Sequence, residues 1–217
     1  MKKFLILAVL AQVLLGSFAS AANETLPIIY KPIEWTENRE RLTREYSLEH
    51  YGFSATSIIP RAIVVHWTAI DSFESTYNYF YNEEFTSGID KGTLNVASHF
   101  IVDRDGTIYR LTPENALNRH AIGYNWCAIG IENVGGVDGR EDLTPAQLEA
   151  NINLIRYLHE GYPTIEYVFG HYQQVEARAS GLYIEKVPDY FAVKTDPGKK
   201  FMQALRDNLE NDGLKFF

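Results

Sequence analysis

Three short apolar runs in this chain each end in a residue that can bind a metal or carry a proton. The runs AIVV, AIGI and IEYVFG are followed directly by His66, Glu132 and His171. Short apolar runs of this kind, bounded by polar residues, are typical of buried β-strands. We therefore expect these three side chains to lie at the ends of three different strands.

Strand-like and helix-like segments alternate along the chain. Thr144, Pro145 and Gln147 form a helix-start signal, because Thr can cap the helix, Pro suits its first position and Gln can complete a capping box. An Asp105-Gly106 pair between two strand-like runs predicts a β-hairpin. The expected helices cover residues 37–50, 72–85 and 145–161 and a stretch that begins at Pro197. This alternation predicts a single α/β domain with a central mixed β-sheet flanked by helices.

Residues 1–21 have the pattern of a secretory signal peptide. Two lysines come first, an apolar run follows, and Ala-Ser-Ala ends the segment before an expected cut after Ala21. An uncleaved N-terminal anchor is the alternative. Residues 22–59 are expected to form a lead-in and a helix, and residues 60–217 the main domain. The expected location is the periplasm or the medium outside the cell.

The charge and the cysteine content exclude several classes of function. The chain has 28 acidic and 20 basic residues, which give a net charge of −8 at pH 7. An acidic surface argues against nucleic acid as a partner and against electrostatic binding to anionic lipid. Cys127 is the only cysteine of the sequence, so no internal disulfide can form, and we expect its thiol to be buried. No segment after the first residues is long and apolar enough to span a bilayer.

His66, His171 and Asp196 are candidate metal ligands. Two neutral imidazoles and one carboxylate suit Zn²⁺, and three protein ligands leave a fourth position for water, as in catalytic zinc sites. Glu132 would then act as a proton carrier beside that water. Taken singly, each histidine has a structural alternative, and Asp196 before Pro197 has the alternative of a simple turn residue. The spacing is long and irregular, so it does not identify a metal site by itself.

Four stretches together resemble the zinc-dependent N-acetylmuramoyl-L-alanine amidases, the type 2 amidase and peptidoglycan-recognition family. The resemblance runs from about Pro60 to Arg206. The stretches are VVHWTA at residues 64–69, HFIVDRDGTIY at 99–109, IGIEN at 129–133, and GH at 170–171 with KTDPG at 194–198. Each stretch is weak alone, but the set is specific.

The resemblance implies a role for each candidate residue. His66, His171 and Asp196 match the ligands of one Zn²⁺ per chain, and Glu132 matches the general acid/base. Lys194 matches a basic residue two positions before the last ligand. Its side chain can point the same way as that of Asp196 in an extended segment, which suits stabilisation of an oxyanion.

The same resemblance assigns two residues to the substrate cleft. His120 matches a histidine near the cleft, which implies contact with saccharide or peptide, and a histidine of the fold is the equal alternative. Asn125 matches an Asn that precedes the IGIEN strand. The chain departs from the pattern at Ile122 and in a shortened loop after His120. A longer aromatic loop at residues 179–193 either lines the cleft or packs on the fold.

The expected function is hydrolysis of the amide between the lactyl group of muramic acid and L-alanine in peptidoglycan or muropeptides, by an exported monomer. A peptidoglycan-binding module without catalysis is the first alternative. The chain keeps all three candidate ligands as well as Glu132 and Lys194, which argues against a module without catalysis. A toxin with the same chemistry that acts on rival cells and a zinc peptidase that cuts within the stem peptide are the others.

Overall fold

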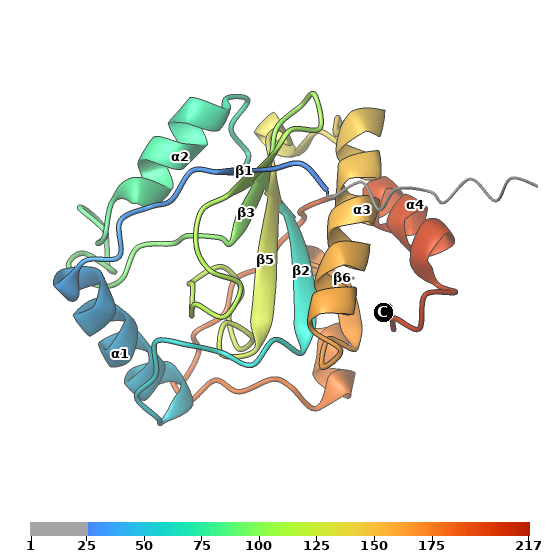
Figure 1. Ribbon diagram of the computed structural model, residues 1–217. Helices are drawn as coiled ribbons and strands as arrows, with labels where there is room; N and C mark the ends of the chain where they lie inside the picture. The colour runs from blue at the N-terminus through green and yellow to red at the C-terminus, as the bar shows by residue number, and fades with distance from the viewer. Residues whose placement is uncertain (1–25) are drawn as a thin grey trace, which may run out of the picture.

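A six-stranded mixed sheet forms the centre of the computed structural model, which describes residues 26–217 (Figure 1). The strand order is β1-β4-β3-β5-β2-β6, and β3 and β4 form the antiparallel pair while the other neighbours are parallel. The predicted hairpin around Asp105-Gly106 is this antiparallel pair. The strands are β1 (Ile28–Tyr30), β2 (Ala62–Trp67), β3 (Phe100–Val102), β4 (Ile108–Arg110), β5 (Ala128–Asn133) and β6 (Tyr167–Gly170).

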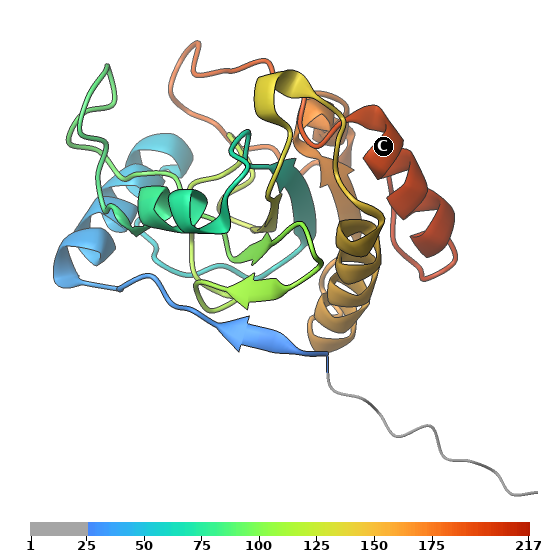
Figure 2. The same ribbon diagram turned by 90° about the horizontal axis from the view of Figure 1, so that it is seen from above.

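Helices cover both sides of the sheet, which confirms the predicted fold class (Figures 1 and 2). Helices α3 and α4 lie on one side, and α1 and α2 lie on the other. The four α-helices are α1 (Glu37–Tyr51), α2 (Phe73–Tyr81), α3 (Pro145–Gly161) and α4 (Lys199–Leu209). Three short 3-10 helices complete the described chain: η1 (Val137–Gly139), η2 (His171–Gln173) and η3 (Glu176–Ser180).

The two faces of β2 and β5 belong to different parts of the core. One face packs with the buried residues of α3 and α4, and the residues of this cluster include Ile63, Val65, Ile129, Ile131, Leu154, Leu158 and Leu205. The opposite face begins with Ala62, Val64 and Ala128 and packs against Tyr124 and Phe169. Side chains alternate along a strand. His66 and Glu132 therefore continue the second face, away from α3 and α4.

Local signals in the sequence account for most helix ends. The Thr36 hydroxyl accepts the Arg39 N–H at the start of α1, and Gly52 ends this helix with a φ of 81°. Thr144 and Gln147 form the predicted capping box of α3. One prediction was too long, because the helix expected over residues 72–85 ends at Tyr81.

A tertiary contact explains the early end of α2. The Asn95 side chain donates hydrogen bonds to the carbonyls of Tyr79 and Asn82, and the backbone of Asn82 is extended. These bonds satisfy carbonyls that another turn of helix would have used. The sequence of residues 72–85 alone holds no sign of this contact.

The N-terminal segment joins the same sheet. The part predicted as an extended lead-in contains β1, which pairs in parallel with β4, and α1 packs Leu42 and Tyr46 against Leu94 and Leu117. The predicted signal peptide, residues 1–21, lies outside the described residues. Within residues 26–217, no helix has the length and apolar character needed to cross a membrane.

The reactivity of the Cys127 thiol tests how tightly the core around β5 is packed. Cys127 is fully buried, and burial raises its pKa to about 12. The reactive form of a cysteine is the thiolate. We expect no reaction with a thiol reagent such as 5,5′-dithiobis(2-nitrobenzoate) at pH 8 in the native protein, and one equivalent of reaction after unfolding in urea. Rapid labelling of the native protein would show that this part of the core opens.

Candidate metal centre and active site

The parallel arrangement of three strands brings the candidate residues together. Strand β2 lies between β5 and β6 and runs parallel to both, so their carboxyl ends meet at one edge of the sheet. His66 pairs in register with Glu132, and His171 follows β6 directly as the first residue of η2. The carboxyl ends of parallel strands are the common location of ligand sites in open α/β sheets.

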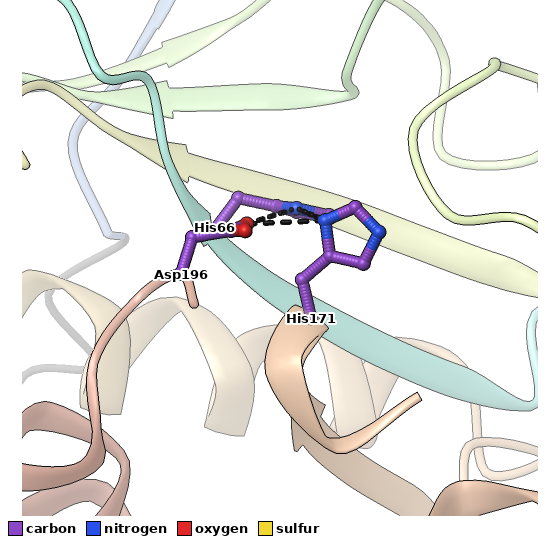
Figure 3. A group of neighbouring side chains, drawn as sticks. All are labelled: His66, His171 and Asp196. Carbon is purple, nitrogen blue, oxygen red and sulfur yellow. Dashed lines mark hydrogen bonds and ion pairs between the residues drawn. The ribbon is translucent and has the colours of Figure 1, made fainter. Parts of the chain in front are cut away.

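His66, His171 and Asp196 form a small buried triangle of nitrogen and oxygen atoms (Figure 3). The Nδ1 atoms of His66 and His171 are 3.0 Å apart, and they lie 3.0 and 3.1 Å from Oδ2 of Asp196. Asp196 comes from the loop before α4. The three residues are only 1%, 5% and 8% exposed. The structure thus brings together the three residues predicted as ligands.

The triangle has the chemistry of a zinc site. Hydrogen bonds alone do not account for it, because each imidazole Nδ1 carries at most one hydrogen and faces two neighbours. Tetrahedral Zn²⁺ with bonds of about 2.0–2.2 Å places its ligand atoms roughly 3.3 Å apart, close to the separations found here. The donor set of two imidazoles and a carboxylate therefore fits Zn²⁺.

The protonation of two of these residues suits metal binding. Burial lowers the pKa of His66 to about 4, so its imidazole is neutral at pH 7. Burial by itself raises the pKa of Asp196, but the contacts of its carboxyl group with the imidazoles of His171 and His66 hold that pKa below its ordinary value. A neutral imidazole and an ionised carboxylate are the forms that bind metal.

Glu132 lies in the same hollow as the triangle. The hollow has a volume of about 240 Å³, and its walls include His66, Trp67, Thr68, Glu132, His171, Lys194 and Asp196. Burial raises the pKa of Glu132 well above its ordinary value, the charge of Asp196 adds to this effect, and Lys194 opposes it. Oε2 of Glu132 is buried and has no hydrogen-bond partner among the described residues. A carboxyl group in this position can accept and return a proton.

Comparison with known proteins identifies the family. Residues 56–199 match the family model of N-acetylmuramoyl-L-alanine amidase. The chain belongs to this type 2 amidase family. The match covers His66, Glu132, His171, Lys194 and Asp196, and it confirms the family that the sequence motifs predicted.

Phage endolysins are related to this amidase-family chain in sequence. The endolysin of Klebsiella phage KP32 is 36% identical over 77 residues, and that of Escherichia phage T7 is 40% identical over 70 residues. These alignments cover 34% and 30% of this chain and 51% and 46% of the endolysins. The chain thus spans about half the length of the curated relatives that it matches.

Solved structures share the fold across nearly the whole chain. The amidase LysC from Clostridium intestinale has a TM-score of 0.53 at 23% identity and covers 88% of this chain and 100% of its own. Bumblebee PGRP-SA has a TM-score of 0.52 at 18% identity, with 89% and 98% covered. At these identities the likeness establishes the common fold alone.

The hollow that contains Glu132 and the triangle continues past Lys194 into a second hollow of about 310 Å³. Arg119 lies in its wall, where its guanidinium donates to the Leu94 carbonyl at 2.6 Å and pairs with Asp90 at 3.3 Å. Tyr190 accepts a hydrogen bond from Arg119 at 2.5 Å. The loop at residues 179–193 both lines this hollow, through Tyr190, and packs on the fold, through Tyr183. Sequence patterns did not single out Arg119.

His120 and Asn125 make internal contacts beside the triangle. Asn125 is fully buried, and its Oδ1 accepts the backbone N–H groups of His120 and Ala121 at 2.8 and 2.6 Å. Its amide also donates to the hydroxyl of Tyr46 at 3.0 Å. His120 is partly exposed and lines both hollows. Substrate contact by either residue stays a prediction.

Zinc titration tests the triangle directly. A ligand that binds only the folded state stabilises it by about 2.7 kcal/mol at one hundred times its Kd. We expect Zn²⁺ to raise the Tm of the zinc-free protein, and we expect His171→Ala to abolish both this rise and stoichiometric zinc binding. Mg²⁺ is the control, because it prefers oxygen ligands. Retained one-to-one zinc in His171→Ala would remove His171 from the ligand set.

Proposed function

We propose that this chain is a zinc-dependent N-acetylmuramoyl-L-alanine amidase. It hydrolyses the amide bond between the lactyl group of muramic acid and L-alanine of the stem peptide. The observation that carries the proposal is the buried triangle of His66, His171 and Asp196 with Glu132 and Lys194 in one hollow, in a chain of this family.

Glu132 and Lys194 have distinct roles in the proposed reaction. When bound by His66, His171 and Asp196, Zn²⁺ polarises the carbonyl and lowers the pKa of water towards about 7. Glu132 accepts the proton of the attacking water and passes it to the leaving amine of alanine as the C–N bond breaks. Lys194 lies beside Glu132 and stabilises the negative charge that develops on the carbonyl oxygen.

The substrate, the cellular location and the oligomeric state are part of the same proposal. Peptidoglycan or muropeptides are the substrates, and the second hollow beside Arg119 and Tyr190 gives room for the part of the substrate next to the reacting bond. Residues 1–21 direct export as a signal peptide and are then removed, and the mature chain acts as a monomer outside the cytoplasm. The net charge of −8 supports a partner other than nucleic acid.

Product analysis tests the bond that is cut. Purified protein is incubated with peptidoglycan with added zinc or with a chelator, and soluble products are identified by mass spectrometry. We expect intact stem peptides with a free L-alanine amine, and we expect them only when zinc is present. Shorter peptides would favour a peptidase. Sedimentation with the wall without release would favour a binding module.

Replacing the proposed acid/base separates chemistry from metal binding. We expect Glu132→Gln to lower the rate by about 10² to 10⁴, the usual contribution of general acid/base catalysis, while one equivalent of zinc stays bound. Glu149→Gln is a matched control, because Glu149 is exposed on α3, and this helix covers the face of the sheet opposite to His66 and Glu132. Both variants are measured for turnover of muropeptide and for zinc content. Full activity of Glu132→Gln would exclude the acid/base role.

A further inference from the structure

A chain of hydrogen bonds leads from the sheet backbone through His120 to His66. Nε2 of His120 lies 3.1 Å from the carbonyl oxygen of Ala128, at the start of β5. Nδ1 of His120 lies 3.1 Å from Nε2 of His66. The two rings meet edge to face, with centroids 5.3 Å apart and an angle of 89°. Nδ1 of His66, on the other side of its ring, faces His171 and Asp196.

The direction of these hydrogen bonds follows from the carbonyl. A carbonyl oxygen only accepts, so Nε2 of His120 carries the hydrogen and donates to Ala128. Nδ1 of a neutral His120 is then an acceptor, and Nε2–H of His66 donates to it. Nδ1 of His66 is left with its lone pair, directed at the triangle. The opposite direction would place a hydrogen on the nitrogen that must bind metal.

We propose that His120 is a positioning residue that holds His66 in the tautomer and ring orientation required of a metal ligand. The inference rests on the metal centre of the proposed function. Partners of a metal-bound imidazole fix its tautomer and raise its basicity. His120 in this role acts through His66, whether or not it also touches substrate.

The surroundings of His120 are built to hold its ring. Asn125 accepts the backbone N–H of His120, which anchors the loop. Gly130 lies flat against the ring, because a Cβ at this position would come within 2.9 Å of both Cγ and Nδ1 of His120. His99 packs on the ring edge to face, with centroids 5.8 Å apart. Backbone, ring face and ring edge are therefore all restrained.

Of the two imidazoles in the triangle, only that of His66 has a hydrogen-bond partner on its far nitrogen among the described residues. Nε2 of His171 is buried and has no hydrogen-bond partner within residues 26–217 as described. His66 therefore depends on its neighbour in a way that His171 does not. A change at His120 is expected to act on the metal centre through His66 alone.

Zinc affinity of variants tests the inference without reference to catalysis. We expect His120→Ala to weaken zinc binding by about 10- to 100-fold, measured by competition with a chromogenic chelator. His120→Asn keeps an acceptor oxygen near the position of Nδ1, and it should recover part of the loss. Gly130→Ala should also weaken binding, because its methyl group displaces the ring. Unchanged affinity in folded His120→Ala would overturn the proposal.

His99 provides a matched control. Its Nε2 also donates to a carbonyl, that of Ala116 at 2.9 Å, and its Nδ1 accepts the Gly130 N–H at 3.0 Å. It is buried, but it makes no hydrogen bond to a ligand of the triangle. We expect His99→Ala to lower Tm and, because His99 packs on the His120 ring without a bond to the triangle, to weaken zinc binding less than His120→Ala does. Equal losses of affinity in His99→Ala and His120→Ala would reduce the role of His120 to packing.

The hydrogen bond between His66 and His120 is also observable in the zinc-loaded protein. Long-range ¹H–¹⁵N NMR of the imidazoles should show that Nε2–H of His66 exchanges slowly with water because it donates to Nδ1 of His120, and this exchange should be faster in His120→Ala. Equal exchange rates in the two proteins would overturn the inference. This result is independent of the amidase assay, so an inactive protein with a slowly exchanging Nε2–H on His66 would contradict the proposed function and leave the role of His120 intact.

Discussion

The parallel register of β2 between β5 and β6 is the constraint on which the site depends. It sets His66 beside Glu132 and places His171 immediately after the next strand. Side chains alternate between the faces of a sheet, so a slip of one residue would turn His66 towards the cluster under α3. Such a slip would also exchange Ile63 and Val64 between two close-packed clusters and would disturb the packing of both. The register that satisfies the core is thus the one that assembles the triangle.

His66 is fixed from both sides of the sheet. Its carbonyl accepts a hydrogen bond from the side chain of Asn133 at 3.0 Å, and Asn133 in turn accepts one from Asn151 on α3 at 2.7 Å. Its ring meets His120, which is held by Asn125. The backbone of the ligand is therefore tied to the α3 side, and its imidazole to the opposite side. Such support holds a functional residue in one geometry.

The sequence predicted the elements whose signals are local. The runs before His66, Glu132 and His171 are strands, and the capping box of Thr144 begins α3 where it was expected. The triangle followed from these strand ends and from the family resemblance. The bond from His120 to His66 did not, because it joins a loop to a strand 54 positions away. The strand β1 and the early end of α2 were missed for the same reason, since each depends on a partner distant in the chain.

The buried polar cluster is hard to explain as a device for stability. Glu132 and His171 each bury a polar atom without a hydrogen-bond partner in the described part of the chain, and such an atom costs about 1–3 kcal/mol. Apolar residues of similar size would pack there at lower cost. The residues that precede His66 in β2 and Glu132 in β5 are apolar, such as Ile63 and Ile129. The fold therefore gives up stability at the carboxyl ends of β2, β5 and β6, and a reactive site there accounts for this cost.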